Sequence, residues 1–144
     1  TQGWTANLWL RLNELPAQDA YILDRGEGAA RLSLVLNGSN LKARYGSVEV
    51  QAATPLAATM WTHLALVVAP AELRLYVNGA MAGSAAITPA ALSGAVSVGG
   101  ASDGTGLLTA DIDELRISNT ARSADWIALS AGIEGERNDA IVTY

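Results

Sequence analysis

Hydrophobic and polar residues alternate along most of this chain with a period of two. Between Trp4 and Leu12 every second residue is apolar, and polar residues such as Thr5, Asn7 and Arg11 stand between them. This pattern is typical of a strand with one buried face. Similar alternation or a short apolar run predicts further strands at residues 21–24, 32–36, 41–45, 48–51, 64–68, 73–77, 95–98, 115–117 and 140–143.

Turn-forming residues separate the predicted strands. The pairs Asn37-Gly38 and Asn78-Gly79 suit the tight turns of β-hairpins, because both residue types accept a positive φ. The glycine-rich segment 99–106 indicates a longer connecting loop. Many short strands with frequent turns predict an all-β fold, either an antiparallel β-sandwich or a barrel.

One short helix is predicted near the C-terminus. Ser123 is a suitable N-cap, because its hydroxyl can accept a hydrogen bond from a backbone amide of the first turn. Trp126, Leu129 and Ser130 would share one face of this helix. Gly132 would end the helix and begin a polar loop before the last strand.

The composition narrows the classes of function. With 144 residues the chain fits one domain, and its 50% hydrophobic residues suit a packed core. The absence of cysteine excludes disulfides and thiol chemistry, and the single histidine, His63, excludes any site that needs two imidazoles. The net charge of −5 disfavours nucleic acid as a partner. The chain also has no basic cluster and no apolar stretch long enough to enter a membrane.

The densest acidic group lies at residues 111–114. Two carboxylates can act as the acid and the nucleophile of a glycosidase. Strict alternation, however, would put Asp111 and Asp113 on one face of the strand and Glu114 on the other. We therefore expect no catalysis. Instead, we expect Asp113 to share its face with Leu115, and either to accept hydrogen bonds from the turn at 119–122 or to pair with Arg122.

Calcium binding is a second use for such acids. Ca²⁺ takes several oxygen ligands, commonly from aspartate side chains and loop carbonyls. No consecutive Asp-x-Asp-x-Asp-Gly loop occurs in the chain. The candidate metal ligands are Asp24, Asp103, Asp111 and Asp113.

Aromatic and basic side chains lie on the strand faces opposite the predicted core. Rings and guanidinium groups on an exposed sheet can stack on sugars and bond their hydroxyls. The alternative is that these cross-strand pairs only stabilise the outer face of the sheet. The candidate ligand-binding residues are Trp9, Arg11, Arg74, Tyr76 and Arg116.

Three stretches carry a resemblance to a known family. The first is GWTANLWLR at 3–11, the second is WTHLALV at 61–67 followed by LRLYVNG at 73–79, and the third is IDELRISN at 112–119 followed by ARS at 121–123. In this order and spacing they resemble the early strand, the central hairpin and the closing strand with its short helix in the laminin-G-like, concanavalin A-like lectin superfamily, particularly its bacterial branch.

The resemblance implies a jelly roll of two antiparallel sheets with one short helix near the C-terminus. Members of the family usually begin with one or two strands before the early tryptophan strand. We therefore expect residues 1–144 to be a single domain that is a fragment of a larger protein and lacks the usual first strands.

The resemblance also implies binding rather than catalysis, in an extracellular, cell-surface or periplasmic setting. We expect a carbohydrate-binding or adhesion module of a larger bacterial surface or secreted protein, with a glycan or protein partner on a cell surface or matrix. Neighbouring domains of the parent protein would be further partners, and calcium is the one candidate cofactor. The alternative is a structural or protein-interaction spacer with no small-molecule ligand.

Overall fold

The computed structural model describes residues 3–140, with side chains described up to residue 132. Ten short strands, joined by turns and loops, make up about half of this part of the chain, and one α-helix follows them. The strands are β1 (Trp4–Leu12), β2 (Ala20–Arg25), β3 (Leu32–Asn37), β4 (Asn40–Tyr45), β5 (Val48–Gln51), β6 (Trp61–Ala69), β7 (Glu72–Val77), β8 (Ala80–Ala86), β9 (Val96–Val98) and β10 (Ala110–Ser118). The helices are the 3₁₀ helix η1 (Gly28–Ala30) and α1 (Ala124–Ala140).

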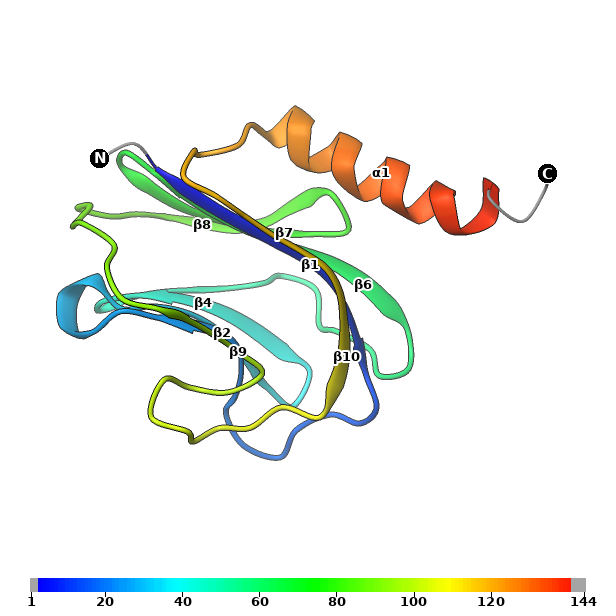
Figure 1. The fold of residues 1–144 in the computed structure, drawn as a ribbon, viewed down its shortest axis with the longest axis horizontal. Coiled ribbons are helices and arrows are strands. Elements are labelled where there is room, and N and C mark those ends of the chain that lie inside the picture. The colour runs from blue at the N-terminus through cyan, green and yellow to red at the C-terminus, as the bar shows by residue number, and fades with distance from the viewer. Residues whose placement is uncertain (1–2, 141–144) are drawn as a thin grey trace.

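The strands form two five-stranded sheets that pack face to face (Figure 1). Sheet A has the order β10-β1-β6-β7-β8, and sheet B has the order β5-β4-β3-β2-β9. Every strand pair in both sheets is antiparallel. The predicted antiparallel sandwich with a helix near the C-terminus is confirmed.

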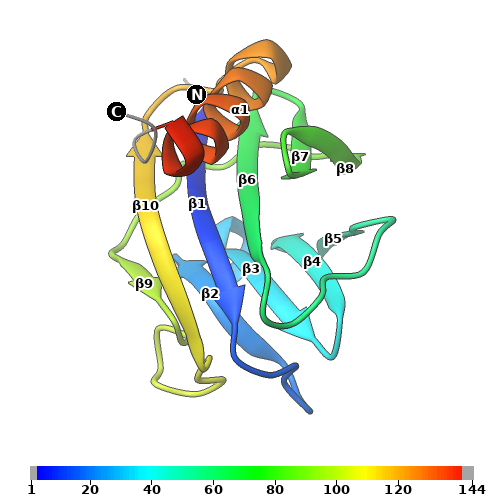
Figure 2. The same ribbon diagram turned by 90° about the vertical axis from the view of Figure 1, so that its right-hand side faces the viewer.

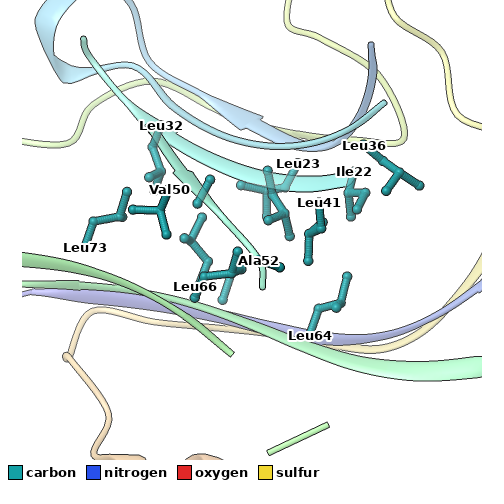
Figure 3. Packing of buried hydrophobic residues seen from close by; sticks show 14 of the residues in the cluster. Ile22, Leu23, Leu32, Leu36, Leu41, Val50, Ala52, Leu64, Leu66 and Leu73 are labelled. Carbon is teal, nitrogen blue, oxygen red and sulfur yellow. The ribbon is translucent and has the colours of Figure 1, made fainter. Parts of the chain in front are cut away.

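The core lies between the two sheets (Figure 3). Leu64 and Leu66 of β6 point from sheet A toward Leu23 and Leu41 of sheet B, and each of the four is at most 1% exposed. On β1 the alternation places every second side chain, beginning with Trp4, in the same layer. Burial of a leucine contributes about 1.5–3 kcal/mol, so the inward faces of the strands supply most of the stability.

The two predicted hairpin turns differ in register. Asn78-Gly79 is the two-residue loop between β7 and β8, with φ angles of 50° and 81°, as the Asn-Gly pair predicts. In the first hairpin Asn37 instead pairs with Asn40, so the loop is Gly38-Ser39. Only Gly38 of that loop has a positive φ, at 57°. The prediction for Asn37-Gly38 was therefore wrong by one residue.

Strand β8 was missed by the sequence analysis. Its sequence, AMAGSAA, is composed of small residues with one methionine, so it carries no alternation of large apolar and polar side chains. It becomes a strand because the Asn78-Gly79 turn folds it back onto β7, which supplies its hydrogen-bonding partner.

Helix α1 begins as predicted but ends later. The hydroxyl of Ser123 accepts a hydrogen bond from the backbone amide of Trp126 at 3.1 Å, which confirms the N-cap. The predicted end at Gly132 is wrong, because α1 continues to Ala140. A glycine inside a helix costs only about 1 kcal/mol and so need not end it. The last predicted strand would start on the final helical residue, and the rest of it lies outside the described residues. Among the described residues, no helix has the length and hydropathy needed to cross a bilayer.

Candidate functional site

Helix α1 covers the outer face of sheet A where β1 begins (Figure 2). Ile127 of α1 is fully buried against Ala65 and Val67 of β6 and Tyr76 of β7. Leu129, in contrast, is 61% exposed. Of the three residues predicted to share a helix face, Trp126 and Ser130 therefore lie against the sheet and Leu129 does not, and the main apolar contact comes from Ile127.

The helix removes part of the predicted ligand-binding face from solvent. Tyr76 is only 1% exposed because it lies between β7 and α1. Asn7 and His63 are also buried there, and the amide nitrogen of Asn7 lies 3.4 Å from Nε2 of His63 and 3.3 Å from the hydroxyl of Ser130 on α1. This half of the face is an internal helix–sheet contact.

Arg74 lies on the same strand as Tyr76 and pairs with an acid. Its Nε donates to Glu72 at 2.6 Å, and this hydrogen bond raises the pKa of Arg74. Arg74 stands opposite Val67 in the sheet, away from Trp9. The structure therefore does not bring Arg74 and Tyr76 together with the other predicted ligand-binding residues.

The other half of the face remains open and is formed by neighbouring strands. Trp9 and Arg11 of β1, Trp61 of β6 and Asp111 of β10 share this surface, which we call the Trp61 patch. Trp61 is 40% exposed, and the guanidinium carbon of Arg11 lies 5.0 Å from the centre of its ring. Arg11 also donates two hydrogen bonds to one carboxylate oxygen of Asp111, at 2.6 and 3.1 Å. An aromatic surface, a cation and an anion thus lie side by side.

A β-bulge in β10 changes which acids face this patch. Asn7 pairs with Arg116 but Trp9 pairs with Asp113, so an additional residue is accommodated in β10. Glu114 takes the strained conformation of the bulge, with a φ of 52°. Asp113 therefore lies on the outer face beside Trp9 and not on the face of Leu115, which corrects the prediction from strict alternation.

Two further contacts of these β10 residues are local. The carboxylate of Asp113 accepts a hydrogen bond from the backbone amide of Glu114 at 2.8 Å, not from the following turn. Arg116 is exposed and donates to Glu114 at 3.1 Å. Arg116 stands opposite Asn7 in the sheet, so it lies at the border between the Trp61 patch and the part of the face under α1.

Trp61 itself was not among the predicted site residues. The prediction started the central strand at residue 64, whereas β6 begins at Trp61. Continuing the alternation backward from His63 would have placed Trp61 on the outer face, directly opposite Arg11.

The predicted metal ligands are divided between the sheets. Asp111 and Asp113 belong to sheet A, whereas Asp24 and Asp103 line one pocket of about 380 Å³ beside sheet B. Within the described residues, no group of three or more histidines or acids is placed to hold a metal ion.

Asp24 is a fully buried carboxylate with a complete set of donors. Its two oxygens accept five hydrogen bonds, two from the guanidinium of Arg31, one from the hydroxyl of Ser33, and two from the backbone amide and hydroxyl of Ser102. Burial alone would raise the pKa of Asp24, but the hydrogen bonds from Arg31, Ser102 and Ser33 outweigh it and hold the pKa well below its usual range. Asp24 thus ties the 99–106 loop to sheet B.

These contacts do not fit a calcium ion. A cation at Asp24 would have to displace Arg31, whose Nε lies 3.0 Å from the carboxylate. The neighbouring Asp103 is occupied by the amide and hydroxyl of Thr105, and these hydrogen bonds lower its pKa. The two aspartates therefore act in this structure as acceptors for protein donors.

Solved structures with the same fold include proteins of several kinds. A native heptameric SAP-like pentraxin from Limulus polyphemus has a TM-score of 0.72 at 13% identity, over 90% of this chain and 70% of the pentraxin. A candidate carbohydrate-binding protein from Bacteroides ovatus has a TM-score of 0.74 at 17% identity, over 88% of this chain and 40% of that protein. Botulinum neurotoxin type C, described as interacting with two ganglioside molecules, has a TM-score of 0.72 at 10% identity, over 92% of this chain and 36% of that structure. At these identities the similarity shows the fold alone, and the chain spans less than half of the last two.

The family is shown by the sequence itself. No curated protein matches the chain significantly. A family model described as the concanavalin A-like lectin/glucanases superfamily, however, matches residues 1–128. This match agrees with the two antiparallel sheets of the sandwich and confirms the resemblance found in the three sequence stretches. The chain therefore belongs to the concanavalin A-like lectin/glucanase superfamily.

Proposed function

We propose that this domain is a non-catalytic glycan-binding module that holds its ligand on the Trp61 patch. The proposal is supported by membership of a lectin superfamily and by the similarity to a candidate carbohydrate-binding protein. We further propose that the domain works outside the cell or at its surface, as part of a larger bacterial protein.

The observation that carries the proposal is the half-exposed ring of Trp61, which lies beside the ion pair of Arg11 and Asp111. An exposed indole offers a flat surface on which the C–H face of a sugar ring can stack. Arg11 supplies N–H donors and Asp111 supplies carboxylate acceptors, 2.6 Å from each other. Sugar hydroxyls both donate and accept hydrogen bonds, so they suit this pair.

The position of the patch in the sheet favours binding. Its residues come from β1, β6 and β10, which are paired to one another and are not on mobile loops. Side chains held on paired strands lose little freedom when a ligand binds, which improves affinity.

The same contacts favour binding over hydrolysis. A glycosidase needs one carboxylic acid to protonate the leaving group and a second carboxylate nearby. Asp111 is already held by two hydrogen bonds from Arg11, which it would have to break to act as that acid. Asp113 is turned toward the backbone amide of Glu114.

A glycan array followed by calorimetry with the best ligand tests this proposal. Trp61→Ala removes the stacking surface, and we expect it to weaken binding by about 10-fold or more, equivalent to about 1.4 kcal/mol. Trp126→Ala is the matched control, because Trp126 also lies beneath an arginine, with Arg122 at 4.7 Å from its ring, but on α1 away from the patch. Binding to no glycan would contradict the proposal and favour a spacer domain, and equal losses in the two variants would contradict the assignment of the patch.

A further inference from the structure

A separate cavity lies at the end of the sandwich where β1 begins and β6 ends. Its volume is about 310 Å³. Trp4 and Arg25 line it together with Ala69, Asn119 and the segment 89–92 between β8 and β9. The cavity shares no residue with the Trp61 patch, so a ligand bound in it would be independent of the proposed function.

Arg25 brings a positive charge to this cavity. Among the described residues, Arg11, Arg31, Arg44, Arg74 and Arg116 each pair with an aspartate or glutamate. Arg25 pairs with none of the described acids, and its guanidinium carbon instead lies 5.4 Å from the centre of the Trp4 ring. Its charge is therefore not neutralised by any carboxylate in the described part of the chain.

Two N–H groups of the lining residues also lack acceptors. Nε of Arg25 and Nε1 of Trp4 are buried and have no hydrogen-bond partner in the described structure. Trp4 is 2% exposed, so its indole cannot turn into bulk water. Buried donors without acceptors are costly, so such groups in native proteins call for an explanation, such as an ordered water or a bound ion.

We infer that this cavity binds the carboxylate of a small ligand, with Arg25 as its main partner. A carboxylate is planar and negatively charged and matches the paired donors of a guanidinium. The volume lies at the lower end of the range for ligand pockets and suits a ligand about the size of a monosaccharide. Pro89 and the alanines after it provide an apolar wall for the body of that ligand.

The overall charge of the chain does not favour anion binding. The net charge is −5, so the protein as a whole repels anions. A carboxylate that binds here is therefore held by local contacts, and its binding depends on Arg25 more than on the field of the whole molecule.

The wall of the cavity is fixed without a ligand. The hydroxyl of Tyr45 accepts a hydrogen bond from the amide of Ala90 at 2.6 Å and donates one to its carbonyl at 3.0 Å. Tyr45 belongs to β4 and is only 3% exposed, so it anchors the segment 89–92 to the core. A preformed site loses less freedom on binding than one that must order its loops.

Titration with glucuronate and with glucose tests the inference, because the two sugars differ in a carboxylate. The four tryptophan indole N–H signals in a ¹⁵N-labelled sample separate the sites: Trp4 reports this cavity, whereas Trp9 and Trp61 report the patch. Trp→Phe variants at the three other positions assign the Trp4 signal by elimination, so a variant of the buried Trp4 is not needed. We expect glucuronate, at up to about 20 mM, to shift the Trp4 signal with a Kd of about 1 mM, and glucose to leave it in place.

Arg25→Gln should weaken glucuronate binding by about 10-fold or more, because it removes charge-assisted hydrogen bonds. Arg44→Gln is the control, since Arg44 lies in sheet B and pairs with Asp19 and Glu49. Acetate provides another arm: a shift equal to that of glucuronate identifies the carboxylate alone as the recognised group, and a weaker shift identifies an acidic sugar. No shift of the Trp4 signal, an equal response to glucose, or full binding by Arg25→Gln would overturn the inference.

Discussion

Replacing Asp24 by asparagine tests how far the buried carboxylate organises the outer face of sheet B. The change keeps the size of the side chain but replaces one oxygen by an NH₂ group. In its better orientation the amide keeps the three hydrogen bonds at the Oδ2 position, from Arg31 Nη2 and from Ser102. The NH₂ group then faces Nε of Arg31 and the hydroxyl of Ser33. The hydroxyl can rotate to accept, but Nε can only donate.

The expected cost follows from these contacts. Removing one member of a buried ion pair costs about 3–5 kcal/mol. Arg31 is 40% exposed, so water can replace part of what it loses, and the lower end of that range applies. We therefore expect Asp24→Asn to lower the free energy of unfolding by about 3 kcal/mol, which lowers Tm by about 6–12 °C in a domain of this size.

Thermal and urea unfolding followed by circular dichroism measure the loss. Asp111→Asn is the matched control, because its pair with Arg11 is exposed, at 44% and 48% of the two side chains. Exposed pairs contribute at most about 1 kcal/mol, so this control should melt close to the unmodified domain. A loss of less than about 1 kcal/mol in Asp24→Asn would refute the reasoning.

The difference in unfolding free energy between the unmodified domain and Asp24→Asn should also depend on pH. The pKa of Asp24 is lowered in the folded state, so its ionised form contributes stability above the unfolded pKa of about 3.9. As the pH falls below about 4, the unfolded state takes up the proton first and this contribution is lost. The gap between the unmodified domain and Asp24→Asn should therefore narrow in acid, and a constant gap from pH 7 to pH 2 would show that the charge is not its cause.

Two further pairs of substitutions test how α1 is attached to sheet A. Ile127→Ala should lower the free energy of unfolding by about 2–4 kcal/mol and speed hydrogen exchange in α1, because Ile127 is fully buried. Its control, Leu129→Ala, should lower it by less than about 0.5 kcal/mol, because Leu129 is 61% exposed. Equal losses of stability in the two variants would contradict the packing described. In thermal melts Gly79→Ala should lower Tm more than Gly38→Ala. Both glycines have a positive φ, but only the new Cβ at residue 79 would lie 3.2 Å from Ala128 of α1. The reverse order would argue against contact between the turn and the helix.

Strict alternation made β1 predictable from Trp4 to Leu12, whereas other features depended on packing that no local pattern reveals. β8 has small residues and forms because β7 offers it a partner. The bulge at Glu114 reversed the faces of the residues around it, and a glutamate with a φ of 52° has no sequence signal.

The site was predictable in part. The outward direction of Trp9 and Arg11 followed from the period of two, and both lie in the Trp61 patch. The burial of Tyr76 did not follow from that period, because the covering helix lies far along the chain. One signal was present: Ala65 and Val67 make the outer face of β6 apolar, as expected for a strand that is covered on both sides. The role of Asp24 as a buried acceptor could not be recognised, because its donors come from residues 31–33 and from the distant Ser102.

A crystal structure of the domain with its best-binding glycan would locate the proposed site. We predict a sugar ring stacked on the indole of Trp61, with its hydroxyls bonded to Arg11 and Asp111, and α1 still packed over Tyr76. A glycan bound elsewhere, for example beside Asp24 and Arg31 on sheet B, with the Trp61 patch empty, would contradict the proposed function.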